Sequence, residues 1–148
     1  MSDGKVIKSD QSQLNEAISQ LRYLQSVYSQ QYELLENQIS TYTMSIDTIS
    51  KGVEVLKNKD SITSSNMLIN AGPGLYFEGK MGSAKNIITY IGAGYLVEKT
   101  PEEAKSYIEE NKKKQEEFLK KMYIDKNKIQ GELIDILYKL ESLQQQAV

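Results

Sequence analysis

Two heptad repeats of nearly equal length constrain this 148-residue chain more than any other feature. In its N-terminal half, apolar or aromatic residues recur at alternating spacings of three and four, with one exception at Gln25. The positions are Leu14, Ile18, Leu21, Gln25, Tyr28, Tyr32, Leu35, Ile39, Tyr42, Ile46, Ile49, Val53 and Leu56. This spacing gives a helix one apolar seam, which is typical of a coiled coil.

The C-terminal half carries a second register of the same kind, with polar exceptions at Lys112, Gln115 and Lys126. The positions are Ile108, Lys112, Gln115, Leu119, Met122, Lys126, Ile129, Leu133, Ile136, Leu140, Leu143 and Ala147. We therefore predict helices at 11–57 and 101–147 that fold back on each other as an antiparallel coiled coil. Matching the two helices from their ends places Leu14 against Leu143 and Leu35 against Met122 or Tyr123.

The start of the second helix has the clearest local signal in the chain. Thr100 is suited to cap the helix, Pro101 to occupy its first position, and Glu103 to complete a capping box. Between the helices the period changes to two, with expected strands at 67–70, 75–81, 86–91 and 95–98. The fold class predicted is α+β: a long two-helix coiled coil with two central β-hairpins at 66–98. Residues 61–65 are expected to form a link, residues 1–10 a flexible tail, and residues 11–148 a single domain.

The β segment is predicted to drive assembly. A lone hairpin is marginal in water and exposes unpaired edges, so these strands need further strands, as in an oligomeric β-barrel. The coiled coil also buries little apolar area for the number of residues it orders, which favours an oligomer. The expected interface residues are Met67, Ile69, Leu75, Phe77, Ile87, Ile88, Ile91, Tyr95 and Val97.

Composition argues against an enzyme. The chain has no histidine and no cysteine, so the commonest acid–base group, the thiol nucleophile and the usual zinc ligands are missing. Carboxylates such as Glu116 and Glu117 fall on helix faces patterned for solvent. Gly92 and Gly94 are followed by a strand-like run rather than a helix, so a hairpin turn explains them better than a phosphate loop. We expect no catalytic residue, no metal and no cofactor.

Charge and hydropathy limit the classes of partner that we expect for this chain. The formal net charge is −2, and the lysines of the second helix alternate with glutamates, so nucleic acid is not expected as a partner. No apolar run is long enough to cross a bilayer, and no apolar leader follows Met1. We therefore expect no membrane partner and a cytoplasmic location.

Apolar residues also lie off the seam near the ends of the two predicted helices. Two interpretations remain open: packing against a neighbouring coiled coil, or a surface for partner polypeptide. Because the end of a coiled coil frays, the distal seam would add to that surface. The candidate polypeptide-binding residues are Leu14, Ile18, Leu21, Tyr23, Leu24, Val27, Ile134, Leu137, Tyr138, Leu140 and Leu143.

The order helix, two hairpins, helix, together with the run from Ile91 to Ala104, resembles the α-class subunits of prefoldin. The stretch 94–100, followed by Ala104 and Lys105, looks closest to subunit 5 of the eukaryotic complex, with an archaeal α subunit as the near alternative. The run 75–81 is similar to the family's second strand. In the first strand the chain departs from the family, since Asn70 follows Leu68 and Ile69 where a proline is usual.

This resemblance implies a hexamer of two α-class and four β-class subunits, whose hairpins form a double β-barrel that carries six coiled-coil arms. It implies that unfolded client chains are held at the arm tips, without ATP, and passed to a cytosolic chaperonin. The alternative function is a structural tether or assembly adaptor that does not hold clients.

Overall fold

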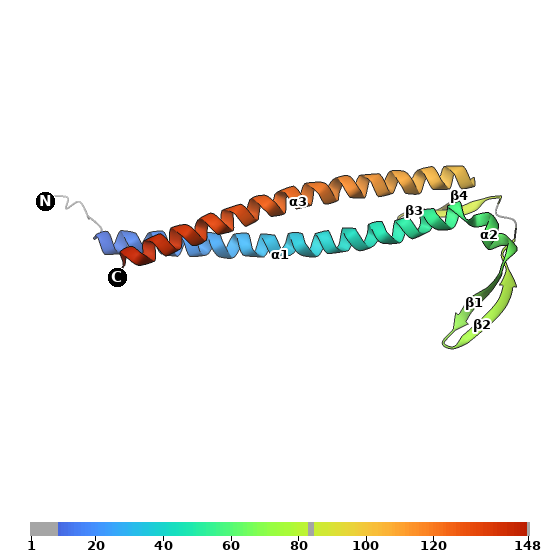
Figure 1. The fold of residues 1–148 in the computed structure, drawn as a ribbon, viewed down its shortest axis with the longest axis horizontal. Coiled ribbons are helices and arrows are strands. Elements are labelled where there is room, and N and C mark those ends of the chain that lie inside the picture. The colour runs from blue at the N-terminus through green and yellow to red at the C-terminus, as the bar shows by residue number, and fades with distance from the viewer. Residues whose placement is uncertain (1–8, 83–84, 148) are drawn as a thin grey trace. The chain divides into compact units, whose positions relative to one another are not determined.

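The computed structural model describes residues 9–82 and 85–147 (Figure 1). Its elements are α1 (Asp10–Lys57), α2 (Lys59–Ser64), β1 (Asn66–Gly72), β2 (Leu75–Lys80), β3 (Ile87–Gly92), β4 (Tyr95–Lys99) and α3 (Pro101–Gln146). Strand β1 pairs with β2, and β3 with β4, as two separate antiparallel sheets of two strands each. The predicted fold class, long helices with two small hairpins between them, is confirmed.

The chain divides into two compact units, one of residues 1–41 with 119–148 and one of residues 42–118. The first unit holds the N-terminal part of α1 beside the C-terminal part of α3, running antiparallel (Figure 1). The second unit holds the other parts of both helices, α2 and both hairpins. The single domain at 11–148 and the tail at 1–10 stay predictions, and residues 1–8 of that tail lie outside the described residues.

The heptad seam forms the core in both units. All thirteen predicted seam positions of α1 are buried or half-buried, and on α3 only Ala147 is exposed. Of the seam residues, Ile39, Ile136 and Leu140 are buried in the first unit and Val53 in the second; Ala104, which precedes the predicted register, is buried as well. Burial of this one stripe is what holds the two helices together, because apolar contact is the main favourable term available to them.

A polar cluster fixes the alignment of the helices in the first unit. Lys126, one of the polar seam residues, donates a hydrogen bond to the Glu36 carboxylate at 2.8 Å, and its Nζ lies 5.0 Å from the Tyr32 ring centroid. In the second unit the rings of Tyr42 and Phe118 are 6.2 Å apart. The contact of Lys126 with Tyr32 agrees with the alignment predicted from the helix ends, and the other two pairs lie within about one helical turn of it.

The Glu36–Lys126 pair makes stability depend on pH. The hydrogen bond and charge of Lys126 lower the pKa of Glu36, and the bond to Glu36 raises the pKa of Lys126. Since the folded pKa of Glu36 lies below its unfolded value, the stabilisation is present above about pH 4.3 and is lost as pH falls through the folded pKa.

Replacing Glu36 with glutamine is therefore expected to lower the melting temperature at about pH 7 and to have less effect as pH falls below about 4. Thermal melts followed by circular dichroism across this pH range measure the difference from wild type. Glu33→Gln, which removes an exposed carboxylate from the same helix, is the control. A wild-type-to-variant difference that stays constant with pH would show that the ion pair is not its source.

The local signals at the helix boundaries are borne out at α3 and not at α2. The Thr100 N–H donates to the Glu103 carboxylate at 3.1 Å and the Glu103 N–H donates to Thr100 Oγ1 at 3.2 Å, so the predicted capping box is confirmed. Residues 61–64, predicted as part of a link, belong to helix α2. Near the end of this helix the Ser65 hydroxyl donates a hydrogen bond to the Ser61 carbonyl at 2.7 Å.

Both hairpins turn through two residues and carry a bulge just before the turn. Pro73 and Gly74 close the first, where Gly74 has φ 73°; Ala93 and Gly94 close the second, with φ 50° and 81°. Positive φ suits glycine, which explains the Gly-rich turns seen in the sequence. The bulges, at 70–72 and 90–92, shift the register by one residue on the first strand of each hairpin.

Candidate interaction surfaces

The first hairpin presents an apolar face that this chain leaves exposed. Ile69 lies directly opposite Phe77, and Met67 opposite Gly79. A Cβ on Gly79 would come within 3.2 Å of the Ile69 side chain, so glycine there gives Ile69 room to cross the sheet. All four interface residues predicted in this hairpin, Met67, Ile69, Leu75 and Phe77, lie on this face.

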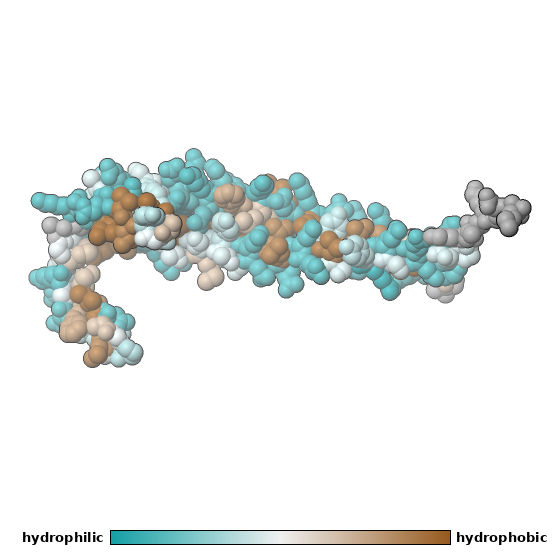
Figure 2. Space-filling view, turned by 180° about the vertical axis from the view of Figure 1, so that it is seen from behind, coloured by the Kyte–Doolittle hydropathy of each residue, from teal (hydrophilic) through white to brown (hydrophobic). Residues whose placement is uncertain are grey.

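Exposure is what makes that face a candidate for assembly. Ile69, Leu75 and Phe77 are 51%, 63% and 66% exposed, and the hairpin shows brown and beige atoms among teal ones in Figure 2. On its other face Leu68 and Tyr76 are exposed as well. A two-stranded sheet with apolar residues open on both faces is typical of a strand pair that is covered in an assembly.

The second hairpin divides the predicted interface residues between two faces. Ile87, Tyr95 and Val97 share one face with Thr89, whereas Ile88 lies on the other, and Ile91 lies at the bulge. Sequence reasoning missed Tyr90 and Leu96, which share the Ile88 face. The side chains of Ile88, Tyr90 and Leu96 are 64%, 60% and 65% exposed. The alternation in 88–90 was the signal that groups Ile88 with Tyr90.

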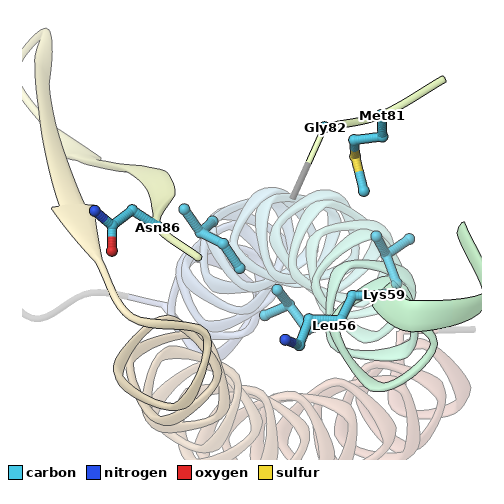
Figure 3. Close-up of a pocket in the computed structure, with 7 residues that line it drawn as sticks. Leu56, Lys59, Met81, Gly82 and Asn86 are labelled. Carbon is cyan, nitrogen blue, oxygen red and sulfur yellow. The ribbon is translucent and has the colours of Figure 1, made fainter. Parts of the chain in front are cut away.

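The base of the second hairpin is covered by its own chain. Val55, Leu56 and Lys59 line a depression of about 420 Å³ together with Ile87, the first residue of β3. Met81, Gly82 and Asn86 complete its lining (Figure 3). Thr89, on the same face as Ile87, is only 7% exposed. The Thr89 face is thus covered within this unit at its base, whereas Tyr95 on the same face is 67% exposed and the Ile88 face is open.

The first unit contains the residues predicted to bind polypeptide. The seam members Leu14, Ile18, Leu21 and Leu143 are half-buried, and Leu140 is buried. The off-seam members are mostly open to solvent, at 70% for Tyr23, 42% for Leu24, 44% for Ile134, 52% for Leu137 and 68% for Tyr138, with Val27 half-buried. The structure therefore places exposed apolar side chains on both helices of this unit.

These off-seam residues do not form one patch. The seam between the two helices has a flank on either side. Lys126 contacts Glu36 on one flank, and heptad spacing places Leu137 of α3 on that same flank. Tyr23 and Leu24, with Ser19 and Gln20, line a depression on the opposite side of α1. Tyr138 lines another depression with Leu21, Leu143, Lys139 and Ser142. The predicted cluster is thus divided among separate patches at a similar level.

Several other exposed apolar residues were not among the candidate binding or interface residues predicted from the sequence. In the first unit they are Leu34 at 58%, Tyr123 at 46% and Ile124 at 55% exposed. In the second unit they are Met44 at 69%, Val55 at 53% and Phe118 at 55%. Single exposed apolar side chains are common, so they carry little meaning alone.

Within 9–82 and 85–147, no group of three or more acidic side chains is arranged so that it could hold a metal ion. In the same ranges no helix is both long and apolar enough to span a membrane.

Two long antiparallel helices joined through two exposed hairpins define a class of protein, the coiled-coil proteins that carry β-hairpins between their two helices. Comparison with known proteins identifies the family. A profile described as "Prefoldin: Prefoldin subunit" matches residues 28–146, and the chain belongs to the prefoldin family. Members of this family are subunits of a chaperone and not enzymes.

The chain is similar to archaeal α subunits of prefoldin. It is 29% identical over 115 residues to the prefoldin subunit alpha of Methanobrevibacter smithii, covering 76% of this chain and 74% of the relative. It is 24% identical over 136 residues to the prefoldin subunit alpha of Pyrococcus horikoshii, covering 90% and 92%. These relatives agree with the archaeal α alternative and give no support to a closer likeness to eukaryotic subunit 5.

A solved structure shows the same fold. The filamentous PFD from Methanocaldococcus jannaschii aligns with a TM-score of 0.67 and 21% identity, covering 80% of this chain and 98% of that one. At this identity the likeness concerns the fold alone.

Proposed function

We propose that this chain is an α-class prefoldin subunit that holds unfolded polypeptides, without ATP, at the distal part of its coiled coil. The observation that carries the proposal is the exposure of apolar side chains on both helices of the first unit, led by Tyr23, Leu137 and Tyr138. Hydrophobic contact is non-directional, so such surfaces suit clients of varied sequence. The half-buried seam residues Leu14 and Leu143 would add to them when the helix ends fray.

Assembly completes the proposed function. We propose a hexamer of two α-class and four β-class subunits in the cytoplasm, joined through the exposed hairpin faces, which passes clients to a cytosolic chaperonin. The support is the open face of Ile69, Leu75 and Phe77 and the open Ile88 face. Several arms acting together would give avidity that one weak surface lacks. In this function the chain has no catalytic residue and needs no cofactor.

Native mass spectrometry of the chain co-expressed with a β-class partner tests the assembly. A single species with the mass of a hexamer is expected. A ladder of species built from this chain alone would contradict the hexamer and indicate polymerisation.

Aggregation of a denatured model client, followed by light scattering, separates a holding subunit from a tether. The complex is expected to suppress aggregation in the absence of ATP. Assembly without any suppression would favour the alternative, a structural tether or assembly adaptor.

A further inference from the structure

One side of α1 in the first unit carries no charge. With the seam of α1 numbered as heptad positions a and d, its outer positions c, f and g between 17 and 41 are uncharged throughout. They are Ala17, Gln20, Tyr23, Leu24, Val27, Gln30, Gln31, Leu34, Asn37, Gln38 and Thr41. Ala17 and Val27 are half-buried and the other nine are exposed. We call these residues the uncharged stripe.

The rest of the first unit shows that this absence of charge is specific to one surface. The charged residues of α1 between 17 and 41 are Arg22, Glu33 and Glu36, which all occupy the other side of the helix. Positions c, f and g of α3 between 121 and 142 are rich in charge, with Lys121, Asp125, Lys128, Glu132, Asp135 and Lys139. Water-facing surfaces usually carry about 25–35% charged residues, whereas charge is depleted where proteins bind.

The side chains of the stripe match the chemistry of an extended polypeptide. Its five amides, at Gln20, Gln30, Gln31, Asn37 and Gln38, each offer both a donor and an acceptor. An extended chain exposes backbone N–H and C=O groups that lack partners of their own. Between the amides, Tyr23, Leu24 and Leu34 are 70%, 42% and 58% exposed and offer apolar contact.

The stripe fits an extended chain better than it fits the arm of a second copy. A packed helix would need an apolar seam at the 3–4 spacing, yet that spacing in the stripe places Gln20, Gln31, Gln38 and Thr41 among its contact positions. A helix also satisfies its own backbone groups, so the amides would face side chains with nothing to bond. An uncharged segment of polypeptide can cover the stripe at little cost, because no charged side chain of the stripe is removed from water when it binds.

We propose that the uncharged stripe binds extended, unfolded polypeptide along about 33 Å of α1, from the depression at Ser19, Gln20, Tyr23 and Leu24 to Thr41. The inference rests on the proposed holding of clients and deepens it. Clients lie along one helix face, through backbone hydrogen bonds and spaced apolar contacts, instead of being held at the helix ends alone.

Charges placed on the stripe test the proposal in the full complex. Two variants, Gln31→Lys with Gln38→Lys and Gln31→Glu with Gln38→Glu, are compared with the control pair Ser26→Lys and Ser40→Lys on the other side of α1. The probe is citrate synthase diluted from guanidine. Charge of either sign is expected to raise the half-suppressing concentration of complex about tenfold, with the control within about twofold of wild type. Native mass and thermal melts verify that each complex is intact.

A photo-crosslinking residue gives a second readout. Benzoylphenylalanine at position 31 is expected to crosslink to denatured citrate synthase, and the same group at position 26 is not. Crosslinks from position 31 to another subunit with or without citrate synthase would overturn the proposal in favour of an arm-to-arm contact. Stripe variants as active as wild type would overturn it and leave the proposed function standing. A wild-type complex that fails to suppress aggregation would overturn both.

Discussion

Deleting residues 1–20 and 139–148 is expected to weaken suppression of client aggregation by at least about tenfold while the oligomer stays intact. The deletion removes Leu14, Ile18, Leu140 and Leu143, and with them the depression that Leu143 lines with Tyr138. The hairpins lie in the other compact unit and keep all their residues. Light scattering of a denatured client measures holding, and native mass spectrometry measures assembly.

A milder variant, which keeps the full length of both helices, separates the effect of losing apolar surface from the effect of shortening the coiled coil. Replacing Leu24, Ile134 and Leu137 with serine is expected to weaken holding only in part, because contacts are spread over several arms and patches. Met44→Ser, which removes a 69% exposed side chain in the second unit, is the matched control. Truncated arms that hold client as well as full-length ones would show that the distal residues are not the site. The off-seam residues would then be contacts between arms.

The helical part of the fold could be predicted because its physics is local and periodic. Seam burial follows from the 3–4 spacing, and the start of α3 follows from Thr100, Pro101 and Glu103 alone. A polar residue within the apolar heptad seam was informative as well. Lys126 breaks the apolar seam, and the structure explains it by its bond to Glu36. A polar seam residue of this kind specifies alignment at some cost in stability.

The candidate site was harder to predict because it depends on which side of an element a residue occupies. Ile88 was grouped with Ile87 by hydropathy, although a strand turns successive side chains to opposite faces. Tyr23 and Leu137 were grouped by level along the arm, although they lie on different sides of the helix pair. The apolar pattern indicated only Tyr23, Leu24 and Val27 of the uncharged stripe, since the feature that its members share is an absence of charge along one side of a helix.

Replacing Ile69 and Phe77 together with aspartate is expected to break the complex into smaller species. The two residues face each other across the first hairpin and are 51% and 66% exposed in the single chain. Aspartates there stay in water in the free subunit and so cost it little. In an assembly that covers this face, the carboxylates would be buried without partners, at a cost of several kcal/mol.

The comparison that isolates the hairpin is a charge on an exposed apolar residue of a helix. Met44→Glu adds a carboxylate at a 69% exposed position of the same compact unit and is expected to leave the native mass unchanged. Circular dichroism should show both variants as helical as wild type, because neither change touches the heptad seam. If the Ile69 and Phe77 variant keeps the native mass of the wild-type complex, this face of the first hairpin is not an assembly contact. The open face of Ile88, Tyr90 and Leu96 would then be the surface through which the subunit assembles.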